Sequence, residues 1–437
     1  MGEKQPSCKG SILSSRVDCF VTNYSHLVNL KDRTVSPEVF TNPDIYLIEQ
    51  EKIFRRCWIF VGHESQVREP GAFLTTTIGE EPVIVVKDHD GKVKVFFNSC
   101  RHRGVKVCRI DHGKAKVFQC PYHGWSYGID GSLVGVPQQK TAYHGDLDKT
   151  QWGLIKVPRV ESFHGLIFAC LDDKAVSLEE YLGDIAWYLE LILRRSKGGT
   201  KLLQGCHRWR VKGNWKLAAE QFAGDNYHAD VLHKSLSLIG LAPSEFRGGI
   251  PWETDFQVKS SNGHGWINFK SPDGPLPPAV EEWIRHSREE SKERLTATQA
   301  GLVHTTHVGG VFPNFAILSF MGFTFVRVWH PRGLNDLDVH SWALADEDAP
   351  DEVVAFLSTM LILNFSSSGI FEQDDVTVWG DMMSTLQGTV RRRFPLNYQM
   401  GAGHERRLSD RPGLIHPPST EIGIFGFHEF WRSLMSR

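Results

Sequence analysis

Hydrophobic and polar positions in the first part of the chain follow the period of a helix and then that of short strands. Asn42-Pro43-Asp44 is typical of a helix start, with a capping side chain followed by proline in the first turn, and an amphipathic pattern continues to Phe54. Across residues 58–171, short β-type runs are separated by glycine and aspartate-glycine turns. These runs are residues 82–87, 92–98, 116–119 and 166–171. The pattern therefore predicts a short helix leading into a small antiparallel β domain.

Helical patterns return at residues 177–193, where Ser177 can cap the first turn. Further on, the pattern predicts a strand at 207–211, helices at 214–236, 281–294 and 352–364, and strands at 323–330 and 337–344 joined by a turn. Strands do not alternate regularly with helices, which favours an α+β fold with antiparallel pairing. We expect an N-terminal segment (1–44) packed on the larger domain, a small antiparallel β domain (45–172), and a larger domain (173–437) with a central antiparallel sheet flanked by helices.

Composition narrows the class of protein. The chain has 437 residues, of which 41% are hydrophobic and 23% charged, and its net charge of -2 gives no indication of a nucleic-acid partner. We see no cationic start followed by an apolar stretch and no long uninterrupted apolar run, so we expect no membrane span and a cytoplasmic location. Most of the eight cysteines are scattered, as suits a reducing compartment. The arginine clusters at 194–195 and 391–393 are expected to be solvated surface, with a docking patch as the alternative.

Two cysteine-histidine pairs stand out in the predicted β domain. They are Cys100, His102, Cys120 and His123. Two thiolates can hold one iron of a [2Fe-2S] cluster while two imidazoles hold the other, which is the Rieske arrangement. A structural zinc site also takes two cysteines and two histidines, but zinc fingers usually keep the two cysteines together and the two histidines together. Gly104 and Gly124 follow the two pairs, so each pair is expected at the tip of a tight loop that contributes to one cluster.

A second candidate metal site lies in the predicted helix at 214–236. Asp225 and His228 are three residues apart, and His233 is five beyond His228. Because five residues turn an ideal helix by about 140° from a common face, the helix must bulge, loosen or end if both histidines bind one metal. Downstream, the segment 371–375 offers the carboxylates of Glu372, Asp374 and Asp375, and two imidazoles with one carboxylate suit ferrous iron with open positions. The alternative is ordinary hydrogen bonding by histidines, but an electron-carrying cluster in the same chain favours iron.

These motifs together resemble the large (alpha) subunit of a Rieske non-haem iron oxygenase of the aromatic-ring-hydroxylating type. The resemblance runs from Ile45 to the C-terminus and rests on the segments 100–104, 120–125, 214–216, 220–228 with His233, and 371–375. It implies a [2Fe-2S] Rieske cluster on the cysteine-histidine pairs and a mononuclear Fe(II) bound by His228, His233 and Asp375, with Asp374 as the fallback carboxylate. It also implies that Asp225 bridges a metal-binding histidine and the cluster ligand His123 of a neighbouring subunit. The assembly would be a ring of three alpha chains, commonly with three small beta chains.

The resemblance also suggests a substrate pocket. Phe222, Phe365 and Phe371 flank the inferred ligands and would form an aromatic-lined cavity, although each could equally be core packing. Gln221 stands where many relatives have asparagine, which leaves the role of its amide open.

The function expected from this set is the terminal oxygenase of a multicomponent dioxygenase, which adds O2 to an aromatic ring to give a cis-dihydrodiol. No glycine-rich dinucleotide motif opens a βαβ unit, so the electrons should come from a separate ferredoxin or flavin NAD(P)H reductase. The alternatives are a monooxygenase of the same build, hydroxylating an aromatic acid or removing an O-methyl group, and a non-catalytic electron-transfer protein.

Overall fold

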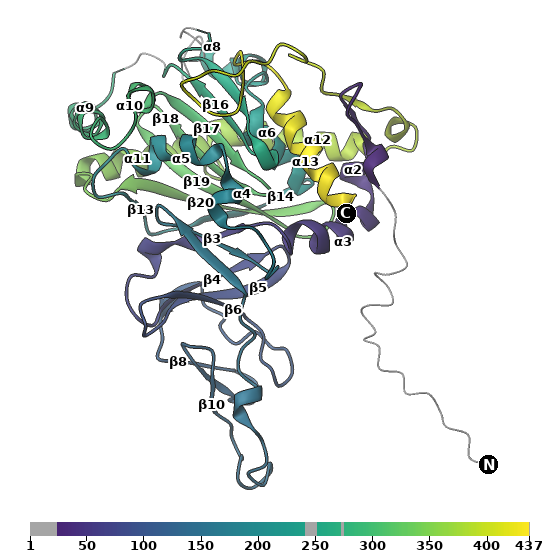
Figure 1. Cartoon of the computed structure of the whole chain (residues 1–437), viewed down its shortest axis with the longest axis vertical. Coiled ribbons are helices and arrows are strands. Elements are labelled where there is room, and N and C mark those ends of the chain that lie inside the picture. Colours follow the sequence, from purple (N-terminus) through teal and green to yellow (C-terminus); the bar gives the residue numbers. More distant parts are fainter. Residues whose placement is uncertain (1–23, 241–250, 272–274, 437) are drawn as a thin grey trace.

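The computed structural model describes residues 24–240, 251–271 and 275–436, and it separates a small β domain from a larger α+β domain (Figure 1). The small domain contains a four-stranded sheet in the order β6-β5-β4-β7 and two three-stranded sheets, β10-β9-β8 and β11-β12-β3, all antiparallel. The strands are β3 (Ile59–His63), β4 (Ala72–Ile78), β5 (Glu81–Lys87), β6 (Val93–Phe97), β7 (His112–Lys114), β8 (Val117–Gln119), β9 (Ser126–Gly128), β10 (Leu133–Gly135), β11 (Arg159–Phe163) and β12 (Leu166–Cys170). The predicted antiparallel β domain is confirmed, and its β8–β10 end projects farthest from the larger domain.

The larger domain is built on a nine-stranded antiparallel sheet in the order β13-β20-β19-β18-β17-β16-β15-β22, with β14 also paired to β20. Its strands are β13 (Thr200–Leu202), β14 (His207–Lys212), β15 (Phe256–Lys259), β16 (Gly265–Phe269), β17 (Thr306–Val311), β18 (Phe315–Phe320), β19 (Phe323–Pro331), β20 (Asp336–Asp346) and β22 (Leu414–His416). The predicted hairpin between residues 323 and 344 is the antiparallel pair β19–β20. The α+β fold with a central antiparallel sheet is therefore confirmed.

Helices cover this sheet and connect it to the N-terminal segment. They are α2 (Glu38–Thr41), α3 (Pro43–Glu49), α4 (Leu178–Leu182), α5 (Ile185–Leu193), α6 (Trp215–Gly224), α7 (Ala229–Leu232), α8 (Lys234–Leu238), α9 (Pro278–Ser291), α10 (Ala297–Leu302), α11 (Asp351–Phe365), α12 (Ile370–Leu386) and α13 (Ile422–Met435). The predicted helix at 177–193 is interrupted at Gly183, whose φ of +49° ends α4 before α5 begins. The predicted helix at 214–236 is likewise divided, into α6, α7 and α8.

Three glycines on neighbouring elements fix the position of α6. A Cβ atom on Gly265 of β16 would lie 1.7 Å from the Ala223 carbonyl oxygen, and one on Gly423 of α13 would lie 2.3 Å from the same atom. On Gly310 of β17, a Cβ would be 2.9 Å from the Ala223 nitrogen. The C-terminal half of α6 thus lies in a slot that only glycine backbones leave open.

A buried ion pair ties α6 to the N-terminal part of the chain. The Glu49 carboxylate of α3 is fully buried, lies 2.8 Å from the Lys216 Nζ, and accepts hydrogen bonds from the indoles of Trp215 at 3.0 Å and Trp431 at 2.7 Å. These partners join α3, α6 and α13, and they satisfy a charge whose burial would otherwise cost several kcal/mol. In addition, β2 (Thr34–Val35) pairs with β21 (Leu396–Asn397), so the described part of the N-terminal segment packs on the larger domain.

Two expectations about surface and membrane are modified by the structure. Arg195 is 7% exposed and forms an ion pair with Asp346, so its assignment to solvated surface is wrong; the buried Asp346 carboxylate of β20 balances its charge. The stretch Asp351–Leu386 reaches a mean hydropathy of 1.7 and is apolar and long enough to cross a membrane by composition alone. In the structure it consists of α11 and α12, separated at residues 366–369, and a core helix of a soluble protein passes the same test.

Candidate metal centres and active site

The two cysteine-histidine pairs lie on two loops with the same backbone hydrogen bonding. In the first loop, the Gly104 N–H donates to the Cys100 carbonyl at 2.8 Å, and in the second the Gly124 N–H donates to the Cys120 carbonyl at 3.0 Å. Both glycines are left-handed, with φ of +74° and +73°. These turns are encoded locally, because only glycine adopts this conformation without strain.

The side chains on these loops suit an iron-sulfur cluster. Cys100 and Cys120 are buried free thiols, and the imidazoles of His102 and His123 are adjacent, with ring centroids 4.6 Å apart. The Nδ1 atom of His102 is buried and has no hydrogen-bond partner among the described residues. Burial and the neighbouring His123 and Arg103 lower the pKa of this histidine, which favours the neutral form that ligates metal. Two thiols and two imidazoles on paired loops of this kind fit a [2Fe-2S] cluster.

A buried tyrosine supports the first cysteine. The Tyr127 hydroxyl lies 3.3 Å from the Cys100 Sγ and accepts a hydrogen bond from the Arg101 N–H at 3.1 Å. The Tyr127 side chain is fully buried, and burial and the Cys100 sulfur raise its pKa. The hydroxyl therefore stays protonated and can donate to the thiolate form of Cys100.

The second candidate site begins where α6 ends. Asp225 is already outside the helix, with φ of -96° and ψ of 87°, and His233 is again non-helical between α7 and α8. The helix is interrupted before His228 and again at His233, as two histidines that bind one metal require, and the prediction of one continuous helix over 214–236 is wrong. The break turns the two imidazoles toward each other, with ring centroids 5.2 Å apart.

Asp375 of α12 completes a set of three metal-ligating groups. Its Oδ1 lies 3.6 Å from the Nε2 of His228 and 3.6 Å from the Nε2 of His233, and one ligand atom from each of the three residues lies within 4.8 Å of the others. These separations exceed hydrogen-bonding distance, and within the described part of the chain the buried Asp375 Oδ1 has no hydrogen-bond partner. A buried carboxylate oxygen that faces two imidazole nitrogens at this spacing fits a divalent metal ion, and the donor set suits ferrous iron.

The neighbouring acid has a different geometry. Oδ2 of Asp374 lies 3.1 Å from Nδ1 of His233, on the side of the ring opposite Nε2. A carboxylate at Nδ1 fixes the tautomer in which Nε2 is free to bind metal. The two aspartates that sequence could not distinguish therefore lie on opposite sides of one histidine.

Asp225 lies against the other histidine. Its Oδ1 is 3.2 Å from Nδ1 of His228, a charge contact rather than a well-aligned hydrogen bond, and it accepts the His228 backbone N–H at 3.2 Å. Burial lowers the pKa of His228, but Asp225 and Asp375 outweigh it and raise the pKa to about 9. Burial raises the pKa of Asp225, and His228 more than offsets this, so the net shift is downward. The acidic surroundings that attract a proton here also attract a metal cation.

A pocket of about 80 Å³ opens above these groups, and we call it the aromatic pocket. All four predicted pocket residues line it: Gln221, Phe222, Phe365 and Phe371. The rings of Phe365 and Phe371 are stacked, with centroids 5.4 Å apart and planes 13° from parallel. Sequence reasoning missed the strand residues of the wall, which are Ile267, Phe269, Thr306, Val308, Leu318 and Phe320. On β17 and β18 these residues occupy alternate positions on one face of two paired strands. The two-residue period of each strand, together with the register between the strands, would have been needed to predict them.

Gln221 is oriented by a residue far away in sequence. The Trp379 indole N–H of α12 donates to the Gln221 Oε1 at 2.6 Å, and the amide Nε2 lies 3.4 Å from the Nε2 of His228. With its oxygen engaged, the amide directs its N–H groups toward the metal-binding side of the pocket.

A fully buried ion pair lies behind the pocket wall. The Arg327 Nη1 of β19 donates to the Glu372 Oε2 at 2.6 Å, and Nη2 donates to the Phe365 carbonyl at 2.8 Å. The guanidinium lies over the Phe325 ring, 4.8 Å from its centroid. Burial raises the pKa of Glu372 to about 7 despite the partly compensating Arg327 charge. This pair links the end of α11 to the α12 turn that presents Asp375.

Comparison with known families assigns both halves of the chain. Residues 57–163 match the Rieske [2Fe-2S] domain, and residues 178–437 match the ring hydroxylating alpha subunit (catalytic domain). The chain belongs to the ring-hydroxylating oxygenase alpha subunits. It is therefore an oxidoreductase that carries a Rieske cluster and a mononuclear iron, as the donor sets above suggest. The structural zinc and purely electron-transferring alternatives are wrong.

Individual relatives agree with this family. The chain is 37% identical to the biphenyl dioxygenase subunit alpha of Paraburkholderia xenovorans (strain LB400), over 95% of both chains. It is 39% identical to the benzene 1,2-dioxygenase subunit alpha of Pseudomonas putida, covering 92% of this chain and 91% of the relative. The naphthalene 1,2-dioxygenase structure from Rhodococcus sp. bound to indole superimposes with a TM-score of 0.86 at 36% identity, covering 97% of this chain and 99% of that one.

A demethylase occurs among the relatives as well. The N,N-dimethyl phenylurea N-demethylase subunit alpha of Sphingobium sp. (strain YBL2) is 32% identical over 94% of this chain and 95% of the relative. Since these names designate alpha subunits, this oxygenase alpha subunit works in an oligomeric assembly with other subunits and receives electrons from partner proteins.

Proposed function

We propose that this oxygenase alpha subunit is the terminal component of an aromatic-ring dioxygenase and adds both atoms of O2 to an aromatic hydrocarbon to give a cis-dihydrodiol. The observation that supports it best is the location of the His228–His233–Asp375 set at the base of a pocket walled by Phe222, Phe365 and Phe371. Such a pocket has few polar groups and would take a flat, uncharged ring. Relatives named for biphenyl and benzene agree with this substrate class.

Each site residue has a role in this proposal. Cys100, His102, Cys120 and His123 hold the Rieske cluster, and His228, His233 and Asp375 hold the mononuclear iron. Ferrous iron with two imidazole ligands and one carboxylate keeps open positions and supplies the activation of dioxygen. Asp374 fixes the His233 ring from its Nδ1 side, as the 3.1 Å contact supports. The stacked Phe365 and Phe371 rings hold the substrate and exclude water, and the Gln221 amide offers N–H donors beside His228.

Asp225 is proposed to connect the two metal centres of neighbouring subunits. One half of this bridge is supported by the 3.2 Å contact between Asp225 Oδ1 and His228 Nδ1. The other half would be His123 of a neighbouring subunit, within a homotrimer of alpha chains (alpha3 or alpha3beta3). A carboxylate suits this position because it can accept a hydrogen bond from each imidazole. We expect Asp225→Asn to keep both metals but slow reoxidation of the reduced cluster by O2 and substrate; normal turnover would contradict the bridge.

The remaining parts of the proposal concern organisation. A ferredoxin, a flavin NAD(P)H reductase, or both would supply the electrons, and a cytoplasmic location fits a supply that starts from NAD(P)H. We propose that the chain is divided into an N-terminal segment (residues 1–44), a Rieske domain (residues 45–172) and a catalytic domain (residues 173–437). Glu49 contacts the larger domain, so the helix that begins at Pro43 acts as a joint between the second and third parts.

Isotope-labelled dioxygen distinguishes the proposal from its main alternative. The enzyme would be supplied with reductase, ferredoxin and NADH, and offered naphthalene, biphenyl and an N-methyl aryl urea. Dioxygenation predicts two label atoms in a cis-dihydrodiol. A monooxygenase or demethylase, which the phenylurea-demethylating relative supports, predicts one label atom or release of formaldehyde. Products of only the second kind would overturn the proposal.

The iron site has its own test. Asp375→Ala should lower the iron content by about one ion per chain and abolish the nitric-oxide-dependent high-spin signal, while the Rieske signal remains. Asp381→Ala is the matched control, because Asp381 is an exposed carboxylate on the same helix and does not line the aromatic pocket. Equal iron content in the two variants would remove Asp375 from the ligand set.

A further inference from the structure

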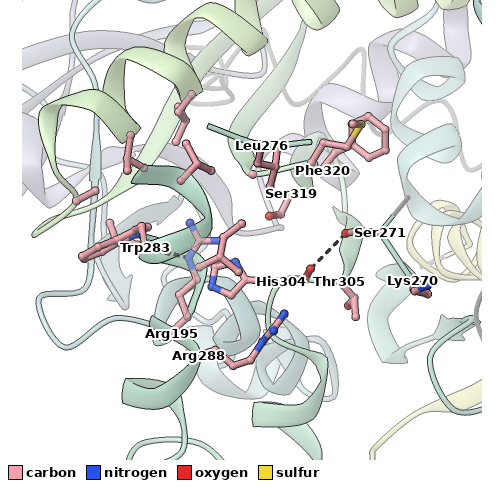
Figure 2. A pocket seen from close by; sticks show the side chains of 18 residues that line it. Arg195, Lys270, Ser271, Leu276, Trp283, Arg288, His304, Thr305, Ser319 and Phe320 are labelled. Carbon is pink, nitrogen blue, oxygen red and sulfur yellow. Dashed lines mark hydrogen bonds and ion pairs between the residues drawn. The ribbon is translucent and has the colours of Figure 1, made fainter. Parts of the chain in front are cut away.

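A second cavity, of about 470 Å³, lies beside the aromatic pocket, and we call it the α9 cavity. Its walls come from α9, from α11, from the turn between β18 and β19, and from the loop after α10 (Figure 2). Among the described lining residues, Phe320 is the one shared with the aromatic pocket. The volume falls within the range of about 300–1,000 Å³ that is typical of sites for small molecules.

One side of the α9 cavity is cationic. Arg195 is 7% exposed, and its Nε donates to the Asp346 Oδ1 at 2.9 Å, while Nη1 has only a long 3.5 Å contact with the Thr324 hydroxyl. Asp346 also accepts the Trp283 indole N–H at 2.9 Å. Asp346, the one carboxylate among the described lining residues, is thus already engaged, and the outer edge of the Arg195 guanidinium is left for another acceptor.

A second guanidinium adds to this charge. Arg288 of α9 lines the cavity, and among the described residues its side chain has no hydrogen-bond or ion-pair partner. His304 lies beside it and bonds to the Ser287 hydroxyl at 2.6 Å. Burial, Arg195 and Arg288 lower the pKa of His304 well below its usual value, so this histidine is a neutral hydrogen-bonding group. Among the described lining residues, two guanidinium groups and the Lys270 ammonium stand against one carboxylate, which leaves an excess of positive charge.

The other side of the cavity is apolar. It is formed by Leu276, Val280, Ile284, Phe320, Val353 and Leu357. Figure 2 shows Arg195, Arg288 and His304 together along one side, with Leu276 and Phe320 on the other and the Ser319 hydroxyl between them. The cavity therefore offers an anion-binding end and a hydrophobic wall within one space.

We propose that the α9 cavity is a second ligand site that binds a small aryl carboxylate. A carboxylate matches the planar edge of a guanidinium, and an aromatic ring would fill the apolar side. A hydrocarbon would leave the buried Arg195 guanidinium without a further acceptor and the exposed Arg288 guanidinium unpaired, and an inorganic anion would leave the apolar wall unused. The set of three metal-ligating groups found in the described chain lies in the aromatic pocket, so the α9 cavity binds its ligand without transforming it.

An occupant of this site would reach the wall of the aromatic pocket. Phe320 lines both spaces, and its ring packs edge-on against Phe371 with centroids 6.2 Å apart. Binding in the α9 cavity would thus act on a residue that shapes the substrate pocket.

Calorimetric titration of the purified, iron-loaded enzyme with phenylacetate tests the proposal. We expect saturable binding at one site per alpha chain, with phenylacetamide binding at least about tenfold more weakly because it lacks the charge. Arg288→Gln should weaken phenylacetate binding by about tenfold or more. Arg285→Gln is the matched control, since Arg285 is an exposed arginine of the same helix that pairs with Glu282 and does not line the cavity. This control should bind like the wild type.

Three results would overturn the proposal: no saturable binding of phenylacetate, equal affinities in the wild type and Arg288→Gln, or equal affinities for acid and amide. Titration in the presence of naphthalene tests whether phenylacetate binds in the aromatic pocket rather than in the α9 cavity. Complete competition by naphthalene together with an unaffected Arg288→Gln variant would assign the acid to the aromatic pocket instead. Because turnover is not measured, failure here is distinct from failure of the proposed dioxygenation.

Discussion

Replacing Tyr127 by phenylalanine should lower the reduction potential of the Rieske cluster. The Tyr127 hydroxyl lies 3.3 Å from the Cys100 Sγ in a fully buried environment, so its removal takes a donor from a cluster sulfur without opening a path for water. One-electron reduction adds negative charge to the cluster, and a donor hydrogen bond therefore stabilises the reduced form more than the oxidised form. Hydrogen bonds to charged groups exceed neutral ones by about 1–1.5 kcal/mol. For a one-electron couple, about 1.4 kcal/mol corresponds to about 59 mV, so we expect a fall of about 40–60 mV.

The assay is a redox titration of the Rieske signal by electron paramagnetic resonance. Tyr122→Phe is the control, because Tyr122 lies in the second cluster loop, is 58% exposed, and has a hydroxyl without a hydrogen-bond partner among the described residues. An unchanged potential in Tyr127→Phe, or an equal shift in both variants, would refute the argument that this hydroxyl donates to the cluster. The variant should also be less stable by about 1–3 kcal/mol, because the Arg101 N–H loses its acceptor.

Three further predictions concern the buried groups around the iron site. The pKa of Glu372 is raised from 4.5 to about 7, so its contribution to the stability of the metal-free protein is present below pH 4.5 and is lost as the pH rises to about 7. This loss is of the order of 3 kcal/mol in the free energy of unfolding. Glu372→Gln should flatten the pH dependence, which denaturant titrations at several pH values would measure. Arg327→Met leaves the Glu372 carboxylate buried without its partner, so we expect the free energy of unfolding to fall by about 3–5 kcal/mol at pH 8. An unchanged unfolding midpoint would contradict a stabilising role of the pair. Trp379→Phe removes the donor to Gln221 Oε1 and should lower the free energy of unfolding by about 1–3 kcal/mol. It should also broaden the distribution of product isomers. Identical products would mean that the Gln221 amide does not orient the substrate.

Local patterns predicted much of the fold. The strands of the small domain, the helix after Asn42 and the β19–β20 hairpin all follow from short-range signals, and the Asn42 side chain does accept the Asp44 N–H as a cap. Helix lengths were predicted less well. The chain breaks at Gly183 and after Gly224, where a left-handed residue and the close packing of α6 against α13 override the hydrophobic period.

The sequence by itself determined the identity of the chemistry, because the two cysteine-histidine loops and the histidine-aspartate motifs are each contained within short segments of the chain. Only the tertiary structure decided how the distant groups face one another. It directs Asp375 toward both Nε2 atoms and Asp374 toward the far side of His233, a difference of one residue that depends on how α12 lies against the two histidines. It also joins Gln221 to Trp379, builds part of the pocket wall from alternate strand residues, and buries Arg195. These contacts connect residues far apart in the chain, and their geometry depends on sheet register and helix packing, which no local pattern encodes.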